Sequence, residues 1–115
     1  MRELEIGTKK YTRVIAMDVK EFNANHEYEI RPVDGGGLLG TVNFQKGPIK
    51  ETGVNGCCNE DLIAMVLDRL QSFQSSEYNC RENALAITKL EEALFWLRAR
   101  TDKREARGVE GTHAI

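Results

Sequence analysis

The chain has 115 residues, of which 41% are hydrophobic and 30% charged, and its formal net charge is −2. This is an ordinary globular mixture, and the charge excludes a uniformly basic protein that coats nucleic acid. The N-terminus has no apolar signal core and no apolar run approaches the length of a membrane span, so we expect a cytoplasmic protein without a membrane contact.

The first part of the chain, residues 1–54, has the pattern of β-strands. Residues 11–19 are rich in β-branched side chains, and residues 26–33 and 38–45 alternate polar and apolar side chains. Turn-forming segments separate these runs, namely "FNANH", "DGGG" and "QKGP". We therefore predict a small antiparallel meander of three or four strands, which needs something to pack on.

Residues 55–108 follow a helical period instead. Asn59 and Asn79 are the predicted N-caps of two helices, and Gly108 is the predicted stop of the second. A connection of about four to six residues makes the pair an antiparallel hairpin. The predicted fold class is α+β in a single domain, 1–115: a β-rich part, 1–54, a helical hairpin, 55–108, and a tail, 109–115.

Three large apolar side chains lie off the main helical stripes: Met65, Phe95 and Trp96. Side chains of this kind are common at protein interfaces, so a second copy of the chain is one explanation for them. The other is that the small sheet covers them. A domain of this size buries a modest part of its surface, which also favours a homo-oligomer, at least a dimer.

Few residues of the sequence suit a catalytic site or a metal site. The three cysteines are Cys57, Cys58 and Cys80, and no two of them have the CxxC spacing of a metal or redox site. Neither histidine, His26 or His113, lies at metal-ligand spacing from a cysteine. We expect reduced thiols, no metal, no cofactor and no catalytic residue.

A basic segment follows the apolar stripe of the second helix. From Arg98 to Arg107 the chain carries five basic and two acidic residues. Within it, Arg100 and Arg104 are one helical turn apart and could present two guanidinium groups to one anion. The alternatives are that these cations stabilise the helix dipole, or that they bind a nucleic-acid backbone in a small regulatory protein.

Two other residues are candidates for ligand contacts. Asn83 heads the apolar stripe of the second helix, and Phe73 closes the first helix near the same end, where each could also be an ordinary core residue. Asn83 and Arg100 are about 25 Å apart along a helix. Phe73 and Arg100 therefore cannot contact one small molecule within a single hairpin, and a shared pocket must lie between subunits.

Several segments carry a resemblance to a known family: "KGPI", "ETGVNG", "NEDLIAMVLDRLQSFQ" and "CRENALAITKLEEALFWLRARTDKREARGVEGTH". They resemble the phage Thoeris anti-defence sponges, which share a hairpin domain with phage anti-CBASS sponges. The resemblance covers about residues 44–113, and "NANHEYEI" extends it loosely toward the N-terminus.

The resemblance implies a viral protein that is not an enzyme and acts in the cytoplasm of the bacterial host. Such proteins bind cyclic ADP-ribose isomers made by a bacterial defence TIR enzyme and keep them from the effector. Some members also bind cyclic di- or trinucleotides at separate sites of a hexamer. By position, Phe73 would stack on the adenine, Asn83 would hydrogen-bond near the ligand, and Arg100 and Arg104 would grip the diphosphate.

Overall fold

The computed structural model describes all 115 residues, and the chain forms two compact units, residues 1–57 and residues 58–115. The first unit is a four-stranded antiparallel sheet with one short helix, and the second is a pair of long helices. The predicted α+β class is therefore confirmed. None of the helices combines the length and the hydropathy needed to cross a bilayer.

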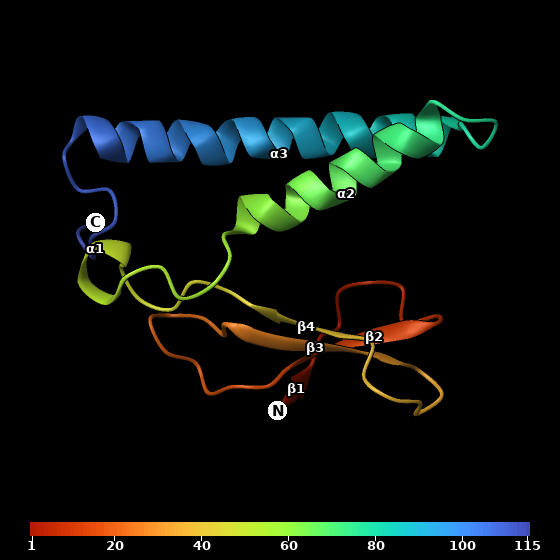
Figure 1. Cartoon of the computed structure of the whole chain (residues 1–115), viewed down its shortest axis with the longest axis horizontal. Helices are drawn as coiled ribbons and strands as arrows, with labels where there is room; N and C mark the ends of the chain where they lie inside the picture. The colour runs from red at the N-terminus through yellow and green to blue at the C-terminus, as the bar shows by residue number, and fades with distance from the viewer. The chain divides into compact units, whose positions relative to one another are not determined.

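The sheet is a meander in which each strand pairs with its neighbour in the sequence (Figure 1). Its strands are β1 (Arg2–Glu3), β2 (Thr12–Ala16), β3 (Glu27–Pro32) and β4 (Gly40–Asn43). The three predicted strand segments contain β2, β3 and β4, and β1 is a short addition at the edge. Two of the turn-forming segments, "FNANH" and "DGGG", lie between strands, and "QKGP" lies between β4 and the helix that follows it.

One row of cross-strand neighbours forms the core of the sheet unit. Ala16 pairs with Tyr28, and Tyr28 pairs with Val42, so the three side chains share one face. Ala16 is fully buried. The Tyr28 ring packs edge-on against Phe44, with ring centroids 5.7 Å apart.

The segment after β4 returns to the sheet and contains the short helix α1 (Ile49–Thr52). Cys57 donates its backbone N–H to the carbonyl of Asn43, and its own carbonyl accepts from Gln45. This return requires a glycine at position 56, since a Cβ there would lie 2.4 Å from the carbonyl carbon and oxygen of Phe44.

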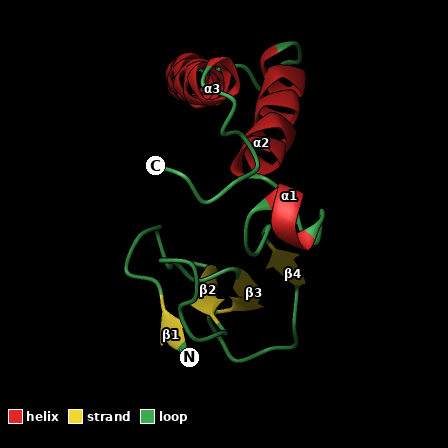
Figure 2. Ribbon diagram, turned by 90° about the vertical axis from the view of Figure 1, so that its left-hand side faces the viewer, coloured by secondary structure: helices red, strands yellow, loops and turns green.

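The second unit is the predicted antiparallel hairpin of α2 (Asn59–Gln74) and α3 (Arg81–Ala106). The two helices pack against each other, and Figure 2 shows α3 end-on beside α2. Residues 75–80 connect them. Gly108 ends the second helix in the left-handed conformation, with φ +73°, as predicted.

The two predicted N-caps are each wrong by one residue, because cysteines hold the cap positions. Cys58 caps α2, and its backbone N–H donates to the Asp61 carboxylate at 2.8 Å. Cys80 caps α3, and its sulfur accepts the Asn83 backbone N–H at 3.4 Å. Asn79, predicted as that cap, instead donates its amide to the Ser76 carbonyl.

The hairpin has very little core of its own. Leu67 is the one buried residue of α2, and α3 has none. The side chains of Met65, Phe95 and Trp96 are 61%, 63% and 62% exposed. A helix pair this exposed is poorly stabilised by its own packing, because burial of apolar surface supplies most of the stability of short helices in proteins.

Candidate functional site

Phe73 lies one residue before the end of α2, and its ring is partly exposed. The guanidinium of Arg69, one turn earlier, sits 5.1 Å from the ring centroid, which is a cation–π distance. The ring is thus held at the surface and stays accessible. Such a ring can act as a platform on which a flat base stacks.

Asn83 lies in the first turn of α3 and is half-buried. Its backbone N–H is held by the Cys80 sulfur, which fixes the position of the residue. Its side-chain amide forms no hydrogen bond within the chain, so both its donors and its acceptor are available to a ligand. Phe73 and Asn83 flank the connection between the helices, as expected from the sequence.

Arg100 is exposed near the C-terminal end of α3. Its guanidinium forms no ion pair or hydrogen bond within the chain. A planar guanidinium in this state can donate two parallel N–H groups to a phosphate or a carboxylate. Arg100 is therefore accessible to an anion, and its role in binding one stays a prediction.

Arg104 is in a different state. Only 12% of its side chain is exposed, and its Nε lies 3.2 Å from the Glu110 carboxylate. Its terminal nitrogens donate to the backbone carbonyls of Val109, Thr112 and Ala114, at 3.0, 3.1 and 2.9 Å. The guanidinium of Arg104 thus holds the C-terminal tail, a contact that the sequence analysis did not foresee.

These residues do not form one pocket within one hairpin. α3 is unbroken over 26 residues, so Asn83 and Arg100 are about 25 Å apart along its axis. Phe73 lies at the same end as Asn83. A small ligand that contacts both ends must therefore be shared by two copies of the chain.

Comparison with known proteins bears on this arrangement. The model of the Acb2/Tad1 hairpin domain matches residues 40–102, which include both long helices. The chain belongs to the Acb2/Tad1 family. It is also similar to Thoeris anti-defense 1 of Bacillus phage SBSphiJ7, with 51% identity over an alignment that covers 98% of this chain and 99% of the relative.

The Acb2/Tad1 match confirms the resemblance inferred from the sequence motifs. It starts at the first residue of β4 and includes the return segment as well as the helices. Phe73, Asn83 and Arg100 lie inside the matched region, and Arg104 lies two residues beyond its end. The relative, by contrast, aligns along almost the whole chain, including the sheet unit.

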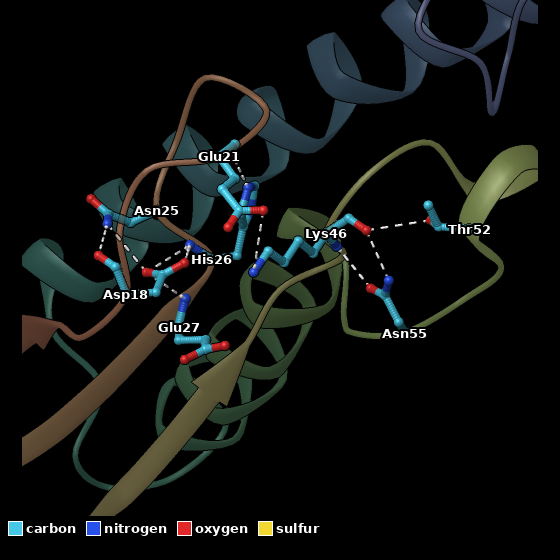
Figure 3. Close-up of polar contacts among 8 residues, drawn as sticks. All are labelled: Asp18, Glu21, Asn25, His26, Glu27, Lys46, Thr52 and Asn55. Carbon is cyan, nitrogen blue, oxygen red and sulfur yellow. Dashed lines mark hydrogen bonds and ion pairs between the residues drawn. The ribbon is translucent and has the colours of Figure 1, made fainter.

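A second polar cluster lies N-terminal to the Acb2/Tad1 match, in the loop between β2 and β3 (Figure 3). The carboxylate of Asp18 accepts the backbone N–H groups of His26 and Glu27 and the side-chain amide of Asn25. Asn25 and His26 are both buried. Burial alone would raise the pKa of Asp18, but these hydrogen bonds outweigh it and lower the pKa below the usual 3.8.

The same loop is joined to the return segment after β4. The Lys46 ammonium lies 3.6 Å from the Glu21 carboxylate, and the Glu21 carbonyl contacts His26 Nε2 at 2.6 Å. Asn55 accepts the Lys46 N–H and donates to the Lys46 carbonyl, both at 2.8 Å, while Thr52 donates to the same carbonyl (Figure 3). These groups satisfy one another, and together they join the loop between β2 and β3 to the return segment.

The sequence analysis missed this cluster. Its signal is a short run of polar residues around a tight turn, in which Phe22 and Asn23 both have positive φ. The chain contains no group of three or more residues that could hold a metal ion, and it has no disulfide bond.

Proposed function

We propose that this chain is a phage anti-defence protein that binds a cyclic ADP-ribose-type signal in the host cytoplasm and sequesters it without cleaving it. Its place in the Acb2/Tad1 family and its 51% identity to Thoeris anti-defense 1 support the anti-defence part. The observation that carries the choice of ligand is Arg100, an exposed and unpaired guanidinium at the end of a long helix. This group suits a diphosphate.

Each candidate residue has a distinct part in the proposed complex. The accessible ring of Phe73 would stack on the adenine, because every base offers a flat π-face. The amide of Asn83 would hydrogen-bond beside it. Arg100 would bind the diphosphate through charge-assisted contacts, with Arg104 one turn away. Binding and release of an unchanged ligand need no nucleophile or general base.

The proposed pocket lies between subunits. It takes Phe73 and Asn83 from one chain and Arg100 from another, because about 25 Å of helix separates the two ends within one chain. The exposed apolar side chains of the hairpin, Phe95 and Trp96 among them, supply a reason for the copies to associate. We propose a homo-oligomer, a dimer or a larger assembly such as a hexamer.

The test is titration calorimetry with cyclic ADP-ribose and its isomers, together with a thermal-shift screen that includes cyclic di- and trinucleotides. A ligand at about a hundred times its dissociation constant adds roughly 2.7 kcal/mol of stability. We expect one class of cyclic ADP-ribose isomer to give saturable binding. Absence of binding to every isomer would refute the ligand assignment.

A second measurement separates a binder from an enzyme. The complex is denatured by heat, and the released nucleotide is analysed by chromatography. We expect the ligand to be recovered unchanged, in a fixed ratio to the protein. Linear or hydrolysed products that accumulate with time would instead indicate catalysis.

The alternative function, a small nucleic-acid-binding regulator, rests on the basic segment from Arg98 to Arg107. Binding to a nucleic-acid backbone weakens steeply as salt rises, because bound counterions are released. Binding of one diphosphate in a formed pocket should depend on salt much less. Duplex and single-stranded DNA titrated at two salt concentrations therefore distinguish the alternatives.

A further inference from the structure

The return segment, residues 44–57, contains the only Asn-Gly pair of the chain, at Asn55 and Gly56. In such a pair the glycine nitrogen can attack the carbonyl carbon of the asparagine side chain, because no Cβ stands in its way. The asparagine loses ammonia in this reaction and becomes a carboxylate. Asn55 is exposed, so water and hydroxide reach it. Sequence and exposure together make Asn55 the candidate for deamidation in this chain.

The reaction balances without an enzyme or a cofactor. The Gly56 N–H gives its proton to hydroxide, and the nitrogen bonds to Cγ of Asn55. The Cγ–Nδ2 bond then breaks, and Nδ2 takes a proton from water and leaves as ammonia. Water opens the resulting succinimide ring at one of its carbonyls. The product is aspartate, or isoaspartate, in which the main chain runs through the former side chain.

Hydrogen bonds hold the side chain of Asn55 away from this reaction (Figure 3). Its Oδ1 accepts the backbone N–H of Lys46, and its Nδ2 donates to the Lys46 carbonyl, both at 2.8 Å. The Asn55 N–H donates to Oε1 of Gln45 at 2.9 Å. Ring closure moves Cγ toward Gly56 and expels Nδ2, so both contacts with Lys46 must break first. The protection of this exposed residue therefore depends on hydrogen bonds and not on burial.

The attacking residue is held as well. A Cβ on Gly56 would lie 2.4 Å from the Phe44 carbonyl and 2.7 Å from the carbonyl oxygen of Asn43, so the main chain packs tightly at this point. The next residue, Cys57, donates its N–H to the same Asn43 carbonyl at 2.9 Å. The peptide between Asn55 and Gly56 cannot turn into the geometry for attack unless the return segment leaves the end of β4.

We propose that Asn55 is a deamidation site, which the folded return segment protects and whose conversion keeps that segment open. Aspartate retains an acceptor for the Lys46 N–H but has no N–H donor, so an oxygen replaces Nδ2 opposite the Lys46 carbonyl. Two acceptors then face each other, and that carbonyl keeps only the Thr52 hydroxyl, at 3.3 Å. Isoaspartate adds a carbon to the main chain, which shifts the register at Cys57. A segment that opens long enough to react cannot close as before.

The residues beside Asn55 also carry the link to the loop between β2 and β3. The Lys46 ammonium lies 3.6 Å from the Glu21 carboxylate of that loop. A Cβ on Gly47 would lie 3.2 Å from the ring of Phe22, so this ring packs on the glycine. Deamidation of Asn55 should therefore loosen the β2–β3 loop together with the return segment.

The test compares deamidation in the folded chain and in the same chain unfolded in urea, both at the same mildly alkaline pH. Peptide mass spectrometry identifies the modified asparagine and measures its rate. We expect Asn55 to react first in the unfolded chain and about tenfold or more slowly in the folded chain, because only molecules with an open return segment react. Equal rates in the two states would overturn the inference, and so would faster reaction of another asparagine in the unfolded chain.

A variant separates the hydrogen bonds from other causes of protection. Gln45→Ala removes the acceptor of the Asn55 N–H and two bonds to the carbonyls of Gly47 and Gly53. It should accelerate deamidation in the folded chain and leave the rate in urea unchanged. Lys50→Ala, which truncates an exposed side chain of α1, is the control and should react like wild type. An unchanged rate in folded Gln45→Ala would show that these bonds do not protect Asn55, against the inference.

The effect of the product is measured on Asn55→Asp, without any nucleotide. Hydrogen exchange of the Cys57 and Gln45 amides reports whether the return segment is paired with the end of β4. Asn55→Asp should accelerate this exchange. Asn59→Asp makes the same chemical change at an exposed asparagine and should not. Exchange in Asn55→Asp that matches wild type would refute the claim that deamidation keeps the segment open.

Discussion

Removal of Trp96 should weaken self-association without unfolding the chain. Trp96 and Phe95 project from α3 with 62% and 63% of their surface exposed, and their rings meet edge-to-face at 5.3 Å. An aromatic side chain with this exposure leaves about 100–150 Å² open to a second copy. At ~25 cal/mol per Å², burial of that area is worth roughly 2.5–4 kcal/mol for each ring.

Trp96→Ala should therefore raise the dissociation constant of the assembly by about a hundredfold or more. Phe95→Ala should act in the same direction. Sedimentation velocity across a micromolar concentration series measures the change, and far-UV circular dichroism checks that helix content is retained. Tyr11→Ala, which removes an exposed aromatic ring from the sheet unit, is the matched control and should leave assembly unchanged.

Two results would refute this reasoning. If the wild-type chain sediments as a monomer throughout, these faces do not join copies of the chain and the proposed intersubunit pocket is lost. If both aromatic variants assemble like wild type, the copies associate through another surface. The exposed rings of α3 would then need a different explanation.

Three other predictions concern single residues. Arg100→Ala should lower affinity for the cyclic ADP-ribose ligand by about thirty- to a hundredfold, because a charge-assisted contact is lost. The melting temperature of the protein should not change. A lower melting temperature with unchanged affinity would instead mean that the charge stabilises the helix dipole. Gly56→Ala should lower the free energy of unfolding, measured by urea denaturation, by about 1–3 kcal/mol, because the added Cβ would meet the backbone of Phe44. An unchanged denaturation midpoint would contradict the close approach of residue 56 to the Phe44 carbonyl. The pKa of Asp18 is lowered in the folded chain, so its stabilisation should be present above the usual pKa of 3.8 and fade as pH falls through the folded value. Asp18→Asn should remove that pH dependence from melting temperatures measured across acidic pH. If the same pH dependence persists in Asp18→Asn, other carboxylates cause it.

The sequence predicted the order of β2, β3, β4 and the two long helices because each has a local signal, whereas β1 and α1, with two and four residues, are too short to give one. Alternation marks β3, and a helical period with Gly108 at its end marks α3. The helix caps were missed because cysteine is not among the usual cap residues, although its sulfur can accept a weak hydrogen bond, as Cys80 does from Asn83.

The candidate site was predictable only in part, because residue spacing predicts which side chains share a helix face but not which groups they contact. The periodic spacing of Arg100 and Arg104 predicts that they share a face, but it says nothing about what each guanidinium touches. The contacts of Arg104 depend on the chain reversal at Gly108 and on backbone carbonyls, which carry no sequence signature. The cluster around Asp18 escaped notice likewise, because it depends on the shape of a loop.

The meander and the hairpin have a consequence for how the chain folds during synthesis. Every strand of the sheet pairs with its sequence neighbour, and α2 packs on the helix that follows it, so nearly all pairings are local in sequence. Proteins rich in local contacts fold in microseconds to milliseconds, whereas a ribosome adds only about 5–20 residues per second. The sheet unit, residues 1–57, can therefore finish folding while the helices are still being made. The exposed apolar faces of the helices emerge after the sheet unit, which shortens the time for aggregation before copies meet.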